Sequence, residues 1–275
     1  MNFFEKFLHF FEGVMERPTN YSWFHLLFMG LVIIATAFFC IKFRDAKDGT
    51  IRRIVLICWI VMVVLEIYKQ LSFSLSVDEN LIASWTYNWY AFPFQLCSTP
   101  LYVLPFIAFM KDTKIRDCFL SYISSFSLFG GLAVYFYPND VFTSEIAINI
   151  QTMVHHGIQV FLGIFLFVYS RRKANFKFYL KGIPVFAVLV ALAIGSNEIV
   201  YAIFQSKGMS DTFNMFYISR HFDCTLPILA DIYKKVSFLP FVLIYIIGFV
   251  IVSIAVFFII LGITRLVQKI TNSRK

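Results

Sequence analysis

The sequence predicts an all-α polytopic membrane protein, a helical bundle with about seven transmembrane helices. Apolar residues make up 59% of the 275-residue chain, charged residues only 15%, and the mean hydropathy is +0.75. A soluble domain is about one quarter charged and at most about half apolar, so this chain has too little polar surface to cover a water-facing globule. The composition therefore excludes a soluble enzyme, a disordered chain and a secreted disulfide scaffold.

Residues 1–22 form an amphipathic segment that we expect to lie on the membrane surface. Its apolar residues recur at helical spacing and are Phe3, Phe4, Phe7, Leu8, Phe11, Val14 and Met15. Charged and polar residues take the opposite face, which is the pattern of an interfacial helix. The segment lacks the basic start and the small-residue cleavage site of a signal peptide.

Residues 23–275 are expected to form a single transmembrane domain. Each apolar run is close to the ~20 residues that a span requires, and the seven runs lie at about 23–43, 54–71, 91–110, 118–137, 147–169, 182–204 and 239–264. The fifth run is the least obvious because it contains His155 and His156. Leaving it out would create long and mostly apolar loops, which is the poorer interpretation.

The distribution of Lys and Arg predicts the orientation. Of the 24 such residues, 17 fall toward one side of the seven spans and seven fall toward the other. Because connections rich in Lys and Arg stay in the cytoplasm, the N-terminus is expected outside and the C-terminus inside. The 17 charges are spread over four connections, which argues against a nucleic-acid partner. Short loops and a composition rich in Phe and Ile favour a multi-pass protein of the bacterial cytoplasmic membrane.

Residues 205–238 are the longest connection predicted on the outer side. This segment mixes charges with aromatic and aliphatic residues, namely Phe213, Phe216, Tyr217, Phe222 and Leu226. That mixture favours a short interfacial helix or a lid over a free loop.

Polar residues at membrane depth point to one site in the outer half of the bundle. A helix rises ~1.5 Å per residue and the apolar core of a membrane is ~30 Å thick. On this scale these polar residues lie roughly 6–14 Å below the outer edge of the core. They come from four spans and comprise Glu66 and Lys69, Gln95 and Cys97, His155 and His156, and Asn197 and Glu198. Ionisable groups at this depth are costly and are usually functional or paired. Spans two, three, five and six are therefore expected to surround one cavity.

Each of these residues also has a structural interpretation. Cys97 can be a small buried apolar residue, and Glu66 with Lys69 can be only a buried ion pair. Either histidine can simply donate to a carbonyl of another helix, and Glu198 can be solvated near the surface. A serine cluster followed by two glycines, at Ser121, Ser124, Ser125, Ser127, Gly130 and Gly131, predicts a close helix-packing face.

The stretch Phe92–Pro100, with sequence FPFQLCSTP, is more specific. Pro93 fits the first turn of a helix, and Gln95 can bond a free N–H there. Pro100 removes the bond to the Leu96 carbonyl, so the backbone beside Cys97 is expected to be irregular and to be buried or to line a wet cavity. A cysteine nucleophile with a histidine base on another helix needs no further group. The five cysteines contain no CxxC pair, so no metal site, redox motif or cofactor is predicted.

These residues together resemble the YwaF-like integral membrane family, which includes the eukaryotic transmembrane-protein-164 branch. The resemblance is carried by Glu66 with Lys69, by Pro93 to Cys97, by His156-Gly157 and by Asn197, in that order over about residues 54–204. The architecture is also similar to membrane lipid hydrolases of the androgen-induced and androgen-dependent type. The Glu–Lys spacing is one residue shorter than in the eukaryotic branch, and the Lys-Pro expected after Asn197 is missing.

The resemblance implies lipid acyl transfer or lipid hydrolysis with membrane lipids as substrates. Cys97 would carry the acyl group as a thioester and His156 would act as the base, while Glu66, Lys69, Gln95, His155, Asn197 and Glu198 would support or orient them. A non-enzymatic binder or transporter subunit is the alternative, because a polar pocket at this depth would serve it equally. A retinal protein is excluded, since residues 239–264 contain no Lys for a Schiff base.

Overall fold

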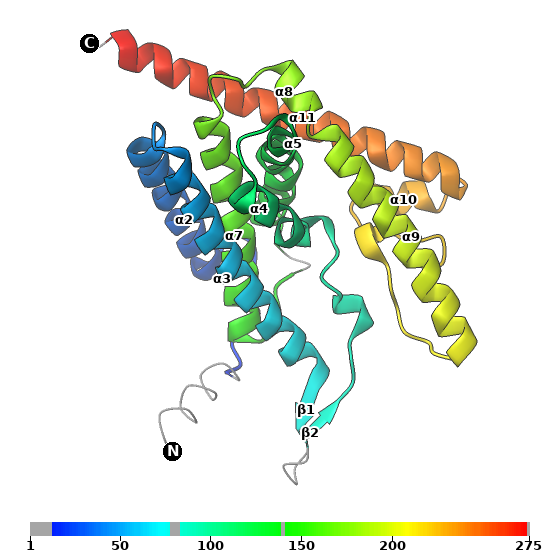
Figure 1. Ribbon diagram of the computed structural model, residues 1–275. Coiled ribbons are helices and arrows are strands. Elements are labelled where there is room, and N and C mark those ends of the chain that lie inside the picture. The colour runs from blue at the N-terminus through cyan, green and yellow to red at the C-terminus, as the bar shows by residue number, and fades with distance from the viewer. Residues whose placement is uncertain (1–12, 78–82, 139–140, 274–275) are drawn as a thin grey trace.

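The computed structural model describes residues 13–77, 83–138 and 141–273, and it is built from helices apart from one short hairpin (Figure 1). The first half comprises α2 (Trp23–Phe43), α3 (Asp48–Ser74), β1 (Leu75–Val77), β2 (Ala83–Trp85), η1 (Trp89–Ala91), η2 (Leu96–Ser98), α4 (Pro100–Phe109), α5 (Lys114–Tyr122), η3 (Ile123–Ser127) and α6 (Leu128–Phe136). The second half comprises α7 (Ile146–Tyr169), α8 (Phe176–Leu180), α9 (Ile183–Lys207), η4 (Met215–Tyr217), α10 (Leu229–Tyr233) and α11 (Phe238–Ser273).

Six helical segments are long and apolar enough to cross a membrane, which confirms the predicted class of fold. Within the described residues they are Trp23–Phe43, Asp48–Ser74, Lys114–Phe136, Ile146–Tyr169, Phe176–Lys207 and Phe238–Ile270. Many large apolar side chains on them are exposed, as at Ile57 (62%) and Ile199 (64%). Exposure of this kind is favourable only when the surroundings are lipid. The orientation in the membrane stays a prediction.

The third predicted span, 91–110, is not a full-length helix. Its helical part, the 3-10 turn η2 together with α4, is Leu96–Phe109, which at ~1.5 Å per residue covers roughly 20 Å of a ~30 Å core. The preceding residues form η1 and an irregular stretch, because Pro93 and Pro100 remove amide donors within a few residues of each other. The helix α4 begins at Pro100, so the expected helix start at Pro93 is wrong.

The helix α7 is the centre of the bundle and packs against α2, α3 and α6. Small residues bring these helices together: a Cβ on Gly131 would lie 2.9 Å from Cβ of Gln159, and one on Gly157 would lie 2.7 Å from Val32. The serine cluster is wholly buried, and its centre, Ile123–Ser127, is a π-helical turn between α5 and α6. The predicted packing face is therefore confirmed.

Ion pairs tie three connections together at one end of the bundle, which we call the inner rim. Arg116 is fully buried and pairs with Asp48 at 2.7 Å, and Tyr169 donates to the same carboxylate at 3.0 Å. Asp117 binds both Lys173 and Lys181. These contacts join the α2–α3, α4–α5 and α7–α9 connections, which are those predicted to be cytoplasmic.

Asp45 lies beside this network, in the turn between α2 and α3. The hydrogen bond from Arg171, with charges of Arg44 and Arg172 nearby, holds the pKa of Asp45 below its ordinary value. Because the side chain is exposed, this pair is expected to fasten the turn only weakly.

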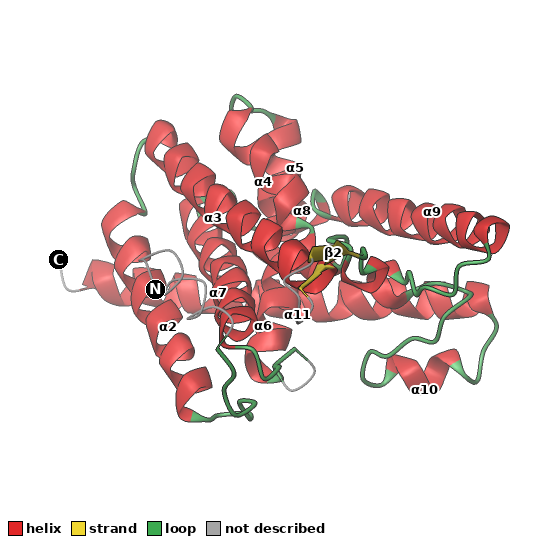
Figure 2. Cartoon of the chain, turned by 90° about the horizontal axis from the view of Figure 1, so that it is seen from below, coloured by secondary structure: helices red, strands yellow, loops and turns green. Residues whose placement is uncertain are grey.

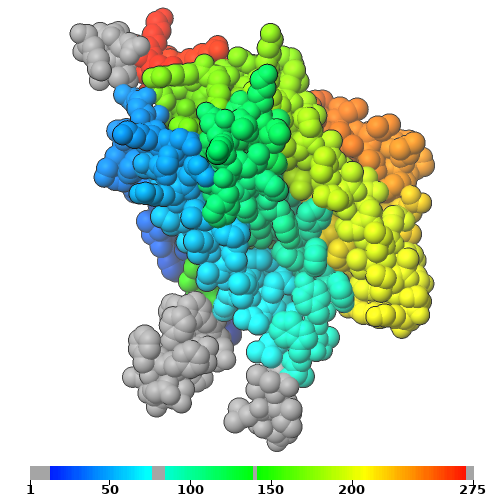
Figure 3. Space-filling view, in the orientation of Figure 1, coloured from blue at the N-terminus to red at the C-terminus, as the bar shows by residue number. Residues whose placement is uncertain are grey.

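The helix α9 runs out to one side of the group formed by α2, α3, α6 and α7, whereas α11 extends from that side across the bundle to the C-terminus on the other side (Figure 2). The long connection between them contains the short helices η4 and α10, and α10 packs on α11. The sequence predicts a short interfacial helix or a lid in residues 205–238; short helices are present, and their place relative to the membrane surface stays a prediction. In Figure 3 the chain that follows β2, coloured cyan to teal, fills the lower part of the space between α3 and α9.

The N-terminal segment differs from the prediction where it can be followed. Residues 1–12 lie outside the described residues. Residues 13–22 are extended rather than helical, and Val14 forms an antiparallel bridge with Glu145. The Met15 amide donates to the Ser144 carbonyl at 2.8 Å, so chain pairing at this point satisfies the backbone groups that a helix would have satisfied internally.

Candidate active site

The backbone around Cys97 is irregular, as the sequence predicts, and its carbonyl groups accept hydrogen bonds from nearby side chains and amides. Pro100 has no N–H, so the Leu96 carbonyl instead accepts from the Thr99 amide at 3.3 Å and from Thr99 Oγ1 at 2.6 Å. The Thr99 hydroxyl also bonds the buried Tyr122 hydroxyl at 2.7 Å. Cys97 is thereby held on a short 3-10 turn, η2, with its side chain partly buried.

Two side chains of α7 reach the main chain of Cys97. His155 Nε2 lies 3.0 Å from the Cys97 carbonyl oxygen, and Gln159 Nε2 donates to the same oxygen. A carbonyl only accepts, so His155 carries its proton on Nε2 and leaves Nδ1 as a bare acceptor. Gln159 was not among the predicted residues, although it follows His155 by one helical turn and is 1% exposed.

One ring nitrogen of His156 bonds to the backbone of its own helix, and the other has no hydrogen-bond partner in the described chain. Its Nδ1 lies 2.7 Å from the Thr152 carbonyl, so by the same reasoning the proton is on Nδ1. The Nε2 atom is buried and has no hydrogen-bond partner among the described residues, and the same holds for His155 Nδ1. Each histidine therefore presents one unprotonated nitrogen in the interior.

Glu66, Lys69 and Gln70 form a polar group on one side of α3. Lys69 Nζ lies 2.8 Å from Glu66 Oε1, and Gln70 Nε2 donates to that oxygen and to the Ala91 carbonyl, both at 2.7 Å. The predicted ion pair is thus present, and Gln70 is a residue that the sequence analysis missed. Gln70 ties this pair to the segment before Cys97, His155 ties Cys97 to α7, and the rings of His155 and His156 lie 5.5 Å apart, so these five predicted residues belong to one neighbourhood.

The other three predicted residues hold the outer connection rather than this neighbourhood. Gln95 binds the main chain of Asn214 and Phe216 at 2.9 and 2.8 Å, and does not bond a helix-start N–H as expected. Asn197 binds both main-chain groups of Met215, at 3.0 and 2.8 Å. Glu198 pairs with Arg220 at 3.0 Å and His221 at 3.1 Å. All three side chains therefore fasten the segment 214–221.

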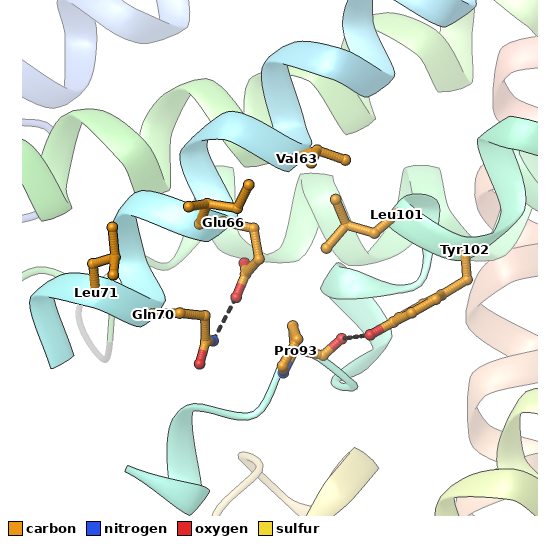
Figure 4. Close-up of a pocket in the computed structure, with 8 residues that line it drawn as sticks. Val63, Glu66, Gln70, Leu71, Pro93, Leu101 and Tyr102 are labelled. Carbon is orange, nitrogen blue, oxygen red and sulfur yellow. Dashed lines mark hydrogen bonds between the residues drawn. The ribbon is translucent and has the colours of Figure 1, made fainter. Parts of the chain in front are cut away.

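A hollow of about 400 Å³ opens between α3 and the segment 93–102 (Figure 4). Its walls are mostly apolar, and the polar exceptions on α3 are Glu66 and Gln70. Neither α7 nor α9 contributes a lining residue. The hollow is therefore formed by the second and third predicted spans, and not by all four spans that were expected to surround one cavity. Groups of three or more residues able to hold a metal ion are absent from the described part of the chain.

The helices and the exposed apolar surface define the class of this protein: it is a polytopic helical membrane protein. Residues 20–261 match the model of the TMEM164 family, and the chain belongs to that family. The predicted relationship to the transmembrane-protein-164 branch is thereby confirmed, whereas the YwaF-like grouping stays a prediction. No curated protein and no solved structure shows significant similarity to the chain.

Proposed function

We propose that this protein is a membrane lipid acyltransferase or lipid hydrolase with Cys97 as its nucleophile and His156 as its base. The observation that carries the proposal is the protonation pattern of the buried histidine. The Thr152 carbonyl fixes the proton of His156 on Nδ1, and Nε2 remains a free lone pair. A general base needs a free lone pair of this kind, and the lipid chemistry implied by the resemblance to the transmembrane-protein-164 branch is consistent with it.

The proposed chemistry has two halves that share one histidine. His156 Nε2 takes the thiol proton, the Cys97 sulfur attacks the ester carbonyl of a lipid, and the collapsing intermediate expels the alcohol, which receives that proton. The acyl group then sits on Cys97 as a thioester. A lysolipid hydroxyl or water gives its proton to His156 and attacks the thioester, which restores the thiol.

Two neighbours have supporting roles in this scheme. His155 and Gln159 hold the Cys97 carbonyl and thereby position the residue. The proposed substrates are membrane lipids, and the proposed location is the bacterial cytoplasmic membrane.

The decisive test is whether an acyl thioester forms on Cys97. Purified protein in nanodiscs is incubated with a phospholipid that carries a labelled acyl chain, and the adduct is sought by mass spectrometry. A label on Cys97 that hydroxylamine releases, and that is absent from Cys97→Ala, supports the mechanism. Full acyl transfer by Cys97→Ala would refute it and would favour the non-enzymatic binder.

A further inference from the structure

We propose that the hollow between α3 and the segment 93–102 is a lateral docking groove for a single-chain lipid whose free hydroxyls bind Glu66 and Gln70. The inference deepens the proposed function, because such a lipid can deliver its hydroxyl to the acyl group. The location of the groove does not depend on that function.

The first argument is a surplus of acceptors. Glu66 is 6% exposed, and its Oε2 has no hydrogen-bond partner in the described ranges. Gln70 Oε1 is unpartnered in the same sense, and the two residues sit one turn apart on α3, joined by the Gln70 Nε2 bond. A buried acceptor without a donor costs about 1–3 kcal/mol, and more when it is charged. A ligand with two adjacent donors would remove both penalties.

The second argument concerns the charge of the ligand. Lys69 already places an ammonium 2.8 Å from Glu66 Oε1. A second ammonium at Oε2 would lie close to the first and would be repelled by it. Neutral donors are therefore favoured, and the two vicinal hydroxyls of a glycerol backbone match the two adjacent acceptors.

The third argument is the apolar wall and where it opens. Val63 and Leu101 line the groove opposite Pro93, as Figure 4 shows. The lining residues Ile67 and Tyr102 are 55% and 40% exposed, so the groove opens sideways to the acyl region of the membrane rather than to water. An acyl chain can enter there without leaving an apolar environment.

The fourth argument places the groove beside the proposed nucleophile. Tyr102 donates to the Pro93 carbonyl at 2.8 Å and so fixes the wall that leads on to Cys97. Pro93, which lines the groove together with Glu66, precedes Cys97 by four residues on the same short segment. A hydroxyl bound at Glu66 is therefore in the same neighbourhood as the acyl group that Cys97 would carry.

The test uses the full chain in phosphatidylcholine nanodiscs and a monoacylglycerol with a diazirine in its acyl chain. After irradiation, the cross-linked peptides are identified by mass spectrometry. We expect label in residues 63–71 and 93–102. A probe with both hydroxyls methylated should label these peptides at least tenfold less, since hydrogen bonds to a charged acceptor are lost. Equal labelling by the methylated probe would refute the hydroxyl contact.

A matched pair of variants tests the location. Val63→Trp fills the groove and should remove most of the label, whereas Val64→Trp lies on the 59% exposed neighbouring position and should not. Labelling that survives Val63→Trp would overturn the groove. Because cross-linking requires no reaction, Cys97→Ala should label normally. A labelled groove without a thioester at Cys97 would refute the proposed function and leave the groove standing.

Discussion

The polar groups of the outer-half neighbourhood and those of the inner rim differ in which atoms they leave without a partner. At the inner rim both carboxylate oxygens of Asp117 have a lysine partner, and among the described residues the charged group left without a partner is a donor, Nη2 of Arg116. In the outer half, one oxygen of Glu66 and one nitrogen each of His155 and His156 have no partner in the described chain. A satisfied network fastens helices, while leftover acceptors in a buried place are available to a substrate. We therefore expect substitutions at the inner rim to change stability and substitutions in the outer-half neighbourhood to change activity.

The largest expected effect is on catalysis and comes from His156→Asn. The Asn amide can replace Nδ1–H toward the Thr152 carbonyl but cannot replace the basic Nε2. We expect acyl transfer to fall by roughly 10²–10⁴-fold, the usual contribution of a general base. Activity is measured with the labelled phospholipid, and an unchanged melting temperature shows that the fold is kept.

His155→Gln is the matched control for that variant. Its amide N–H can still reach the Cys97 carbonyl, while the free Nδ1 is lost. We expect most of the activity to remain. If His155→Gln abolishes acyl transfer and His156→Asn retains it, the roles assigned to the two histidines are exchanged.

The next largest effect is on stability at the inner rim. Asp48→Ala leaves the fully buried Arg116 without its carboxylate. Breaking a buried pair in this way costs about 3 kcal/mol. Arg116→Met should cost less, because Asp48 is 36% exposed and regains water. Thermal unfolding in detergent measures both, and the reverse order would show that packing of the Arg116 side chain matters more than charge.

A smaller and local effect is expected from Asn197→Ala. The change frees the Met215 N–H and carbonyl, both buried, at a cost of about 2 kcal/mol. Hydrogen exchange should speed up in residues 213–219 while the melting temperature moves little. The control is Ser196→Ala, whose hydroxyl bonds only the Ala193 carbonyl of its own helix. Protection unchanged in Asn197→Ala would mean that Gln95 and Glu198 hold the segment without it.

The smallest effect is the pH dependence of the exposed Asp45 pair. Since its pKa is lowered in the folded state, mainly by the Arg171 hydrogen bond, its stabilisation is present above the unfolded value of about 3.9. The stabilisation is lost as the pH falls through the lowered value. The difference in melting temperature between wild type and Asp45→Asn should therefore be constant above about pH 4 and shrink below it. A difference that grows toward acid would contradict this sign.

Hydropathy predicts the long helices well because burial in lipid depends on composition alone. The run 23–43 coincides with Trp23–Phe43, and 147–169 differs from Ile146–Tyr169 by one residue. The same method fails for 91–110, because hydropathy does not register the amide donors that Pro93 and Pro100 remove. It also misses the hairpin Leu75–Val77 with Ala83–Trp85, which is too short to give a pattern.

The candidate site residues were predicted as one layer, and only part of that layer lies together. Depth along each helix grouped Glu66, Lys69, Cys97 and the two histidines correctly, but it also included Gln95, Asn197 and Glu198, which hold the segment 214–221 instead. Neighbouring side chains on a helix point ~100° apart. An error of a few residues in a predicted helix boundary therefore leaves the direction of each side chain undetermined. The bond of His155 to the Cys97 carbonyl therefore could not be foreseen. Gln159 was missed because its partner is a carbonyl that exists as a free acceptor only in the irregular turn.

The short third span has a consequence for how the protein enters the membrane. Carbonyls along this segment depend on side chains of other helices: Ala91 on Gln70, Cys97 on His155 and Gln159, and Leu101 on Trp59 at 2.8 Å, since Pro105 offers it no donor. An isolated segment could not satisfy these groups in hydrocarbon. Stable burial of this segment in the hydrocarbon core is therefore expected only once it has packed against α3 and α7.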